Sequence, residues 1–259
     1  MGASGKDLII IQNASAALTI DSVITNNSGA TALTKVGAGT LVLTGNNTYT
    51  GGTHIHGQAG GGTRGILQVS KIADAGDSNL GNSTGGSNGL YLNNGLLEYT
   101  GAAAATTGRS VQLLSGGGEF RVTTAAASLE LNGVVSGEAL NSDEGFYSGQ
   151  GILVKSGDGT LILSGTQANT YTGDTTVNTG TLALNKTGST EISPVNAVNG
   201  NIILNNSARL VLMAPIKSRI RHSSRSTAPA CSVWKRRMRP SEDSQELLRR
   251  PRCKTEWMA

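Results

Sequence analysis

The sequence is poor in aromatic and charged residues and has no long hydrophobic run. Aromatic residues are 3% of the 259 positions, and charged residues are 15%. Apolar runs are short, as at residues 8–11 and 152–154, whereas a membrane-spanning helix needs about 18 apolar residues in succession. No segment keeps a helical apolar period, and Gly costs about 1 kcal/mol at each interior helix position. The sequence therefore argues against a transmembrane helix and against a helical bundle, and its leucine and β-branched content argues against disorder.

Cysteine and tryptophan are absent from positions 1–213, and glycine is absent from positions 214–259. Both cysteines, Cys231 and Cys253, lie in the second of these ranges, whereas all 36 glycines lie in the first. Nine basic and thirteen acidic residues give the first part a net charge of −4, and twelve and four give the remainder +8. We therefore predict two parts, a β-rich segment at 1–213 and a basic tail at 214–259. With no cysteine, the first part has no disulfide framework.

The basic tail has three interpretations. The first is a basic arm that binds nucleic acid or an anionic membrane through residues 235–239 and 249–252. The second is a capping segment with a short helix at 242–250. The third is translation out of frame, which we favour because the β pattern stops inside the apolar run at 210–213. We expect an irregular tail that makes no specific nucleic-acid contact.

The first part contains short β-type runs separated by Gly, Asn, Ser, Thr and Asp. Leucines alternate with other residues inside these runs, which places one apolar set on one face of each strand. Asn-Gly and Gly-Gly pairs between the runs favour tight turns. The predicted inward-facing leucines include Leu41, Leu43, Leu161 and Leu163.

Internal repetition is the strongest signal. Residues 33–51 read LTKVGAGTLVLTGNNTYTG, and residues 153–173 read LVKSGDGTLILSGTQANTYTG. Such units bury their apolar face only by stacking on neighbours, which predicts an all-β, right-handed parallel β-helix (β-solenoid). With coils of roughly 20–24 residues, the first part would form about nine or ten coils, and at the usual strand spacing the rod would be roughly 45 Å long. An antiparallel sandwich is the alternative fold.

These residues resemble the autotransporter-associated β-strand repeat. The matching letters are Gly-x-Gly-Thr-Leu-x-Leu followed by Asn-Thr-Tyr-Thr-Gly and a Gly-x-Leu strand, and they occur near residues 33–70 and again near 152–185. The resemblance covers nearly all of residues 8–213. It implies a passenger segment of a type V secreted protein, displayed at the surface or outer membrane of a Gram-negative bacterium or secreted from it.

The resemblance also implies a function and partners. It indicates a non-enzymatic stalk that supports secretion and adhesion, with a host-surface or matrix ligand and the outer-membrane barrel of the full-length protein as partners. The chain shows neither a signal peptide nor that barrel, so we expect a fragment. The alternative function is a β-helical polysaccharide-acting enzyme or a glycan-binding module.

Candidate site residues are few, and we predict no catalytic, cofactor or metal site. His54 and His56 could chelate a metal because alternate strand residues share a face, but a surface role is favoured. The letters Gly60-x-Gly62-x-x-Gly65 match a dinucleotide fingerprint, yet a strand follows them instead of a helix. Gly76-Asp77-Ser78 resembles a serine-hydrolase motif without a His or Asp partner.

The acidic residues and the tyrosines bear on whether the protein cleaves or binds polysaccharides. A solenoid enzyme needs clustered carboxylates on one exposed sheet, and we interpret the acidic residues here as scattered. Glycan binding favours exposed aromatic rings, but Tyr49 and Tyr171 share a repeat position and are expected at structural corners. The acidic residues are Glu98, Glu119, Glu130, Asp143 and Glu144, and the remaining tyrosines are Tyr91, Tyr99 and Tyr147.

Overall fold

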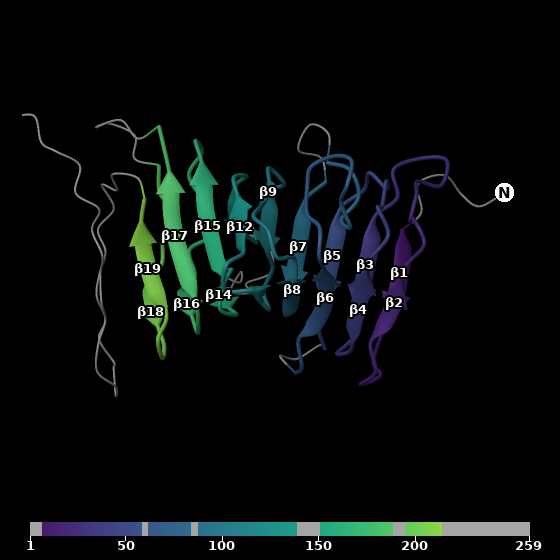
Figure 1. Cartoon of the computed structure of the whole chain (residues 1–259), viewed down its shortest axis with the longest axis horizontal. Coiled ribbons are helices and arrows are strands. Elements are labelled where there is room, and N and C mark those ends of the chain that lie inside the picture. Colours follow the sequence, from purple (N-terminus) through teal and green to yellow (C-terminus); the bar gives the residue numbers. More distant parts are fainter. Residues whose placement is uncertain (1–6, 59–61, 84–87, 139–150, 189–194, 214–259) are drawn as a thin grey trace, which may run out of the picture.

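The computed structural model describes residues 7–58, 62–83, 88–138, 151–188 and 195–213, and every regular element in these ranges is a β-strand (Figure 1). None of these residues belongs to a helix long and apolar enough to cross a membrane. The predicted tail at 214–259 lies outside the described residues. The strands are β1 (Leu8–Ile11), β2 (Leu18–Ile20), β3 (Leu33–Val36), β4 (Thr40–Leu43), β5 (Thr53–His56), β6 (Gly65–Val69), β7 (Leu90–Asn93), β8 (Gly95–Tyr99), β9 (Ala105–Thr107), β10 (Val111–Leu113), β11 (Gly118–Val122), β12 (Ser128–Leu131), β13 (Val135–Gly137), β14 (Leu153–Ser156), β15 (Thr160–Gly165), β16 (Thr175–Val177), β17 (Thr181–Lys186), β18 (Ile202–Leu204) and β19 (Arg209–Leu212).

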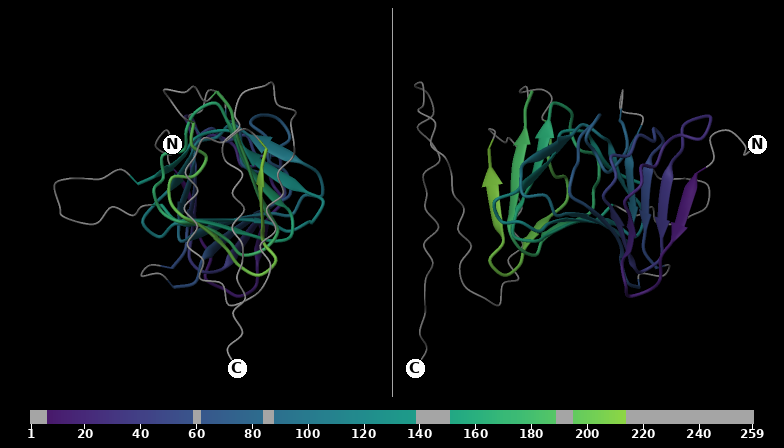
Figure 2. Two further views of the ribbon diagram at one scale, coloured as in Figure 1. Left: turned by 90° about the vertical axis from the view of Figure 1, so that its left-hand side faces the viewer. Right: turned by 45° about the vertical axis from the view of Figure 1, so that its right-hand side comes forward.

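The strands form three parallel sheets that run along one stack of coils. Sheet A has the order β1-β3-β5-β7-β10-β13, sheet B the order β2-β4-β6-β8-β11-β14-β16-β18, and sheet C the order β9-β12-β15-β17-β19. All strand pairs are parallel, and the left panel of Figure 2 shows the strands arranged around a common interior. This arrangement confirms the predicted all-β solenoid and excludes the antiparallel sandwich.

Inward-facing apolar side chains fill the interior. Leu41, Leu161 and Leu163 are 0% exposed and Leu43 is 1% exposed, as the alternation predicts. Neighbouring coils place like residues in register, for example Leu129 with Leu161 and Leu182. Because each leucine packs on the leucines above and below it, the core is continuous from coil to coil.

The described residues form fewer coils than expected. Sheet B, the longest sheet, contains eight strands, whereas the sequence suggested nine or ten coils. The coils are unequal in length, because more chain separates the register partners Gly118 and Leu153 than separates the next pair, Leu153 and Thr175. Longer coils reduce the number of coils that the same chain can form.

The two repeat copies occupy different sides of the solenoid. In the first copy β3 lies in sheet A and β4 in sheet B, whereas the matching β14 and β15 lie in sheets B and C. The loop at 44–52 replaces a third strand in the first copy, and the loop at 166–174 does so in the second. The displacement arises because β13 occupies sheet A in the coil of the second copy, so that copy begins one side later, in sheet B with β14.

Candidate functional site

The loops that replace the third strand contain the Asn-Thr-Tyr-Thr-Gly motif that both repeat copies share. In the first copy, Asn47 is 1% exposed and bonds to the coils on both sides of its own. Its Oδ1 accepts a hydrogen bond from the Ile24 backbone N–H at 2.8 Å, and its Nδ2 donates to the Asn79 carbonyl at 2.6 Å. One side chain therefore connects three successive coils.

The second copy repeats this bonding at the matched positions. Asn169 is 2% exposed, accepts from the Val135 N–H at 2.9 Å and donates to the Ala197 carbonyl at 2.8 Å. The Thr48 and Thr170 N–H groups each donate to the carbonyl of the same preceding-coil residue, Ile24 or Val135, at 2.9 Å. The loop is thus a defined unit that is independent of the side of the solenoid on which it lies.

The two tyrosines of the repeat are buried in these loops. Tyr49 and Tyr171 are both 0% exposed, and their hydroxyls lie 2.7 Å and 2.8 Å from the Oγ1 atoms of Thr53 and Thr175. Burial raises the pKa of Tyr49 to about 12 and also raises the pKa of Tyr171. These phenols are neutral and cannot contact a ligand, in agreement with the predicted corner role.

A buried lysine lies on the first strand of each copy. Lys35 and Lys155 are 0% exposed, and each ammonium donates to the carbonyl of the glycine two residues later. Those glycines, Gly37 and Gly157, have φ values of 93° and 74°, where an L side chain is strained. Burial lowers the pKa of both lysines to about 8. Because Lys35 donates to the Gly37 carbonyl and Lys155 to the Ser156 and Gly157 carbonyls, we assign these lysines to turn stabilisation.

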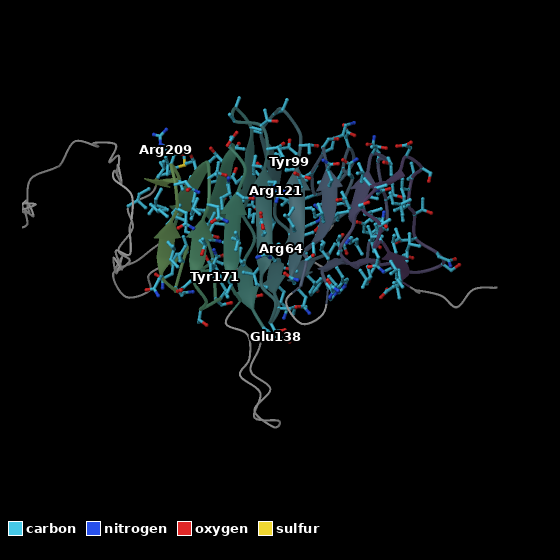
Figure 3. The ribbon with its side chains drawn as sticks, turned by 90° about the horizontal axis from the view of Figure 1, so that it is seen from below. Arg64, Tyr99, Arg121, Glu138, Tyr171 and Arg209 are labelled. Atoms are coloured by element: carbon cyan, nitrogen blue, oxygen red, sulfur yellow. The ribbon has the colours of Figure 1, made fainter. Side chains whose placement is uncertain are left out.

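A charged network crosses the outer face of sheet B. Glu98 on β8 and Arg121 on β11 are register partners, with Oε1 and Nη1 3.4 Å apart. Glu119 is also outward-facing on β11; its Oε2 lies 3.1 Å from Nε of Arg64, and its Oε1 bonds to the Ser156 hydroxyl and lies 3.5 Å from Arg121. Figure 3 shows Arg64 and Arg121 near the middle of the rod.

For Glu98 and Glu119, this network corrects the interpretation that the carboxylates are scattered. Glu98 and Glu119 cluster because Glu98 pairs in register with Arg121, one coil further along the chain. The number of residues between Glu98 and Arg121 can be read from the sequence, but whether they are neighbours depends on the length of the coil between them. Each oxygen of both carboxylates has a donor, since the remaining Glu98 oxygen accepts from Gln68 at 3.3 Å. These contacts link strands and loops of four successive coils.

Of the other acidic and aromatic candidates, Glu130 and Tyr99 make separate contacts. Glu130 is on sheet C, where it accepts from the Thr106 hydroxyl at 3.2 Å, and Tyr99 donates to the Ala103 carbonyl at 3.0 Å. Asp143, Glu144 and Tyr147 lie outside the described residues.

The serine-hydrolase-like motif lies in a turn. Ser78 is 0% exposed, and its hydroxyl accepts from the N–H groups of Ala73 and Leu80. Asp77 pairs with Lys71 at 2.8 Å on the surface. Nothing in this arrangement activates the hydroxyl as a nucleophile. Gly60 of the glycine motif lies outside the described residues, and Gly65 begins strand β6, so no helix follows the motif.

His54 and His56 lie on the outer face of β5. Their rings are parallel within 5° with centroids 6.2 Å apart, and His54 also stacks on Tyr91 of the next coil at 4.3 Å. Burial lowers the pKa of both imidazoles; His56 adds to the effect at His54, and Asp7 opposes it. Among the described residues, no group of three or more His, Cys, Asp or Glu could hold a metal ion.

Comparison with known proteins agrees with this arrangement. Residues 33–57 and 153–184 match the Passenger-associated-transport-repeat family, the segments that contain the paired lysines, asparagines and tyrosines. The chain is also 40% identical over 184 residues to the Adhesin BmaC autotransporter of Brucella suis biovar 1 (strain 1330). The chain is a repeat-containing autotransporter passenger segment. The full-length parent is accordingly assigned to the cell surface or outer membrane of a Gram-negative bacterium.

The passenger segment spans a small part of this relative. The match covers 70% of the chain but 5% of the length of the Brucella protein. No solved structure matches the chain.

Proposed function

We propose that this passenger segment is a non-enzymatic stalk that supports secretion and holds adhesive parts of its parent away from the cell. The observation that carries this proposal is the loop bonding, in which Asn47 and Asn169 each connect three coils. Repeats that contact only their neighbours fold by adding one unit to the next. A coil that emerges from the cell can then stack on coils already folded outside and oppose backsliding.

The proposal extends to partners of the parent protein. The Brucella relative is named an adhesin, which supports a host-surface or matrix ligand for the whole protein. In this scheme the segment supplies rigidity and length, and the buried polar atoms of the loops supply stacking specificity instead of ligand contacts.

The test is surface display of the parent passenger with both loop asparagines replaced. The variant Asn47→Ala with Asn169→Ala should reduce the amount of passenger accessible to added protease on intact cells by at least fivefold. Asn205→Ala is the matched control, because Asn205 donates to the Asn178 side chain at an exposed position. Unchanged display of a double variant that is measurably destabilised in purified form would contradict a role for this stacking in export.

The alternative is a polysaccharide-acting or glycan-binding surface, and one observation favours it. Glu98, Glu119 and Arg121 gather on the outer face of sheet B, which is the type of surface such solenoids use. A glycan panel assayed with the wild type and with Glu119→Gln separates the two functions. Turnover of one glycan that Glu119→Gln abolishes would replace the stalk proposal with an enzyme.

A further inference from the structure

Strand β5 presents two imidazoles to solvent from one face. Thr53 and Ile55 point into the core, where they are 2% and 0% exposed, so the alternate residues His54 and His56 point outward. The rings face each other in a nearly parallel pair, with centroids 6.2 Å apart. Tyr91 stacks on the other side of His54 at 4.3 Å and holds that ring in place.

The surroundings of the pair are neutral or acidic. The register neighbours of His54 are Thr34 on β3 and Tyr91 on β7, and His56 pairs with Asn93. None of these neighbours is cationic, and Asp7 is close enough to act electrostatically on His54. A cation at the imidazoles therefore meets no repulsion from these strands.

We propose that His54 and His56 form a two-imidazole chelate for a borderline divalent transition metal such as Zn²⁺, Cu²⁺ or Ni²⁺. Imidazole nitrogen suits these ions, whereas Ca²⁺ and Mg²⁺ require oxygen ligands. With His54 held by Tyr91, side-chain rotation of His56 brings the second nitrogen toward a shared ion. Two protein ligands leave coordination positions that water or a donor from a partner surface fills.

The second repeat copy provides an internal comparison. Thr176 and Asn178 stand at the positions that match His54 and His56, with Thr176 outward on β16. The repeat therefore folds without imidazoles at these positions, and packing of the coils does not require the histidine pair. This metal site goes beyond the stalk function and does not depend on it.

The experiment uses the full chain with Cys231 and Cys253 alkylated and with His222→Asn, because these are the remaining thiols and imidazole of the sequence. Cu²⁺ is added at pH 7.5 and followed by electron paramagnetic resonance. We expect one bound ion whose superhyperfine splitting reports two imidazole nitrogens. His54→Asn and His56→Asn should each weaken Cu²⁺ binding at least tenfold, with unchanged circular dichroism.

A gain-of-function variant keeps the test independent of any folding defect. Thr176→His with Asn178→His should add a second two-imidazole site, on β16 and the residue directly after it, and raise the stoichiometry from one ion to two. Copper affinity within twofold of the parent in both single variants would overturn the proposal. So would a parent spectrum that reports fewer than two imidazole nitrogens.

Discussion

Buried polar side chains define the repeat at the scale of single residues. Asn47, Lys35 and Tyr49 direct their polar atoms to backbone or hydroxyl partners, and Asn169, Lys155 and Tyr171 do the same in the second copy. A buried polar group costs free energy unless it is bonded, so these residues tolerate few alternative arrangements of the neighbouring coils. The repeated letters therefore specify how coils stack.

Asn47→Ala is expected to lower the free energy of unfolding by about 2–3 kcal/mol, because it leaves the Ile24 N–H and the Asn79 carbonyl buried without this partner. Urea unfolding followed by circular dichroism measures the change. Asn205→Ala, at an exposed position, should change it by less than about 0.5 kcal/mol. Equal effects of the two substitutions would show that the loop bonds do not stabilise the stack.

The buried lysines predict a pH dependence of stability. Burial lowers the pKa of Lys35 and Lys155 from 10.5 to about 8, so the folded state binds fewer protons than the unfolded state between these values. The free energy of unfolding should therefore rise as the pH increases from about 8 to about 9.5. Urea titrations at pH 7.5, 8.5 and 9.5 measure this rise.

Lys35→Met with Lys155→Met should flatten that rise, although Lys186, whose pKa is also lowered to about 8, retains part of it. Measurements stop at pH 9.5 because unfolded tyrosines ionise near pH 10, whereas burial raises the pKa of Tyr49 to about 12. An identical pH profile in wild type and double variant would exclude the lysines as its source.

At the scale of strands, alternation alone determines which side chains enter the core. On β4, Leu41 and Leu43 point inward while Val42 is half-buried on the outer face, and β15 repeats this with Leu161, Leu163 and Ile162. Because parallel pairing places like residues in successive coils, a cavity in one coil also removes contacts from the next.

Leu41→Ala and Leu161→Ala should each lower the free energy of unfolding by about 2–5 kcal/mol. Val42→Ala and Ile162→Ala are the matched controls on the same strands and should cost clearly less. Chemical denaturation gives all four values. If the outward substitutions cost as much as the inward ones, the register of these strands would be wrong.

At the scale of the whole molecule, the described residues leave an unpaired strand edge at the first and the last coil. Strands β1 and β2 each pair on one edge, and so do β18 and β19. Apolar side chains are exposed near these ends, including Ile9 at 61%, Ile11 at 68% and Met213 at 54%. The proposed boundary between the β segment and the basic tail follows directly after β19.

Truncation after Met213 should leave the β-type circular dichroism intact and shift the unfolding temperature by less than about 2 °C, because the tail has too few large apolar side chains to offset its ordering entropy. Differential scanning calorimetry of the full and truncated chains makes the comparison. A decrease above about 4 °C would show that the tail covers the last coil.

The sequence by itself determined the strands, their inward leucines and the repeat. These features are local. The alternation at Leu41 and Leu43 indicates which face of the strand a residue occupies, and the repeated residues around Asn47 and Asn169 indicate burial, whatever the distant neighbours are. The sequence also indicated that Tyr49 and Tyr171 share a role, because they share a place in the repeat.

Only the tertiary structure decided which side of the solenoid each copy occupies and which outward residues meet. The coils differ in length, as the register partners of Leu153 on its two sides show, so a fixed sequence offset does not predict a neighbour across coils. Glu98 meets Arg121, and Arg64 reaches Glu119, only once the loops have set the register. The physical reason is that pairing between coils depends on the accumulated length of the chain between them, whereas the direction of a side chain on a strand does not.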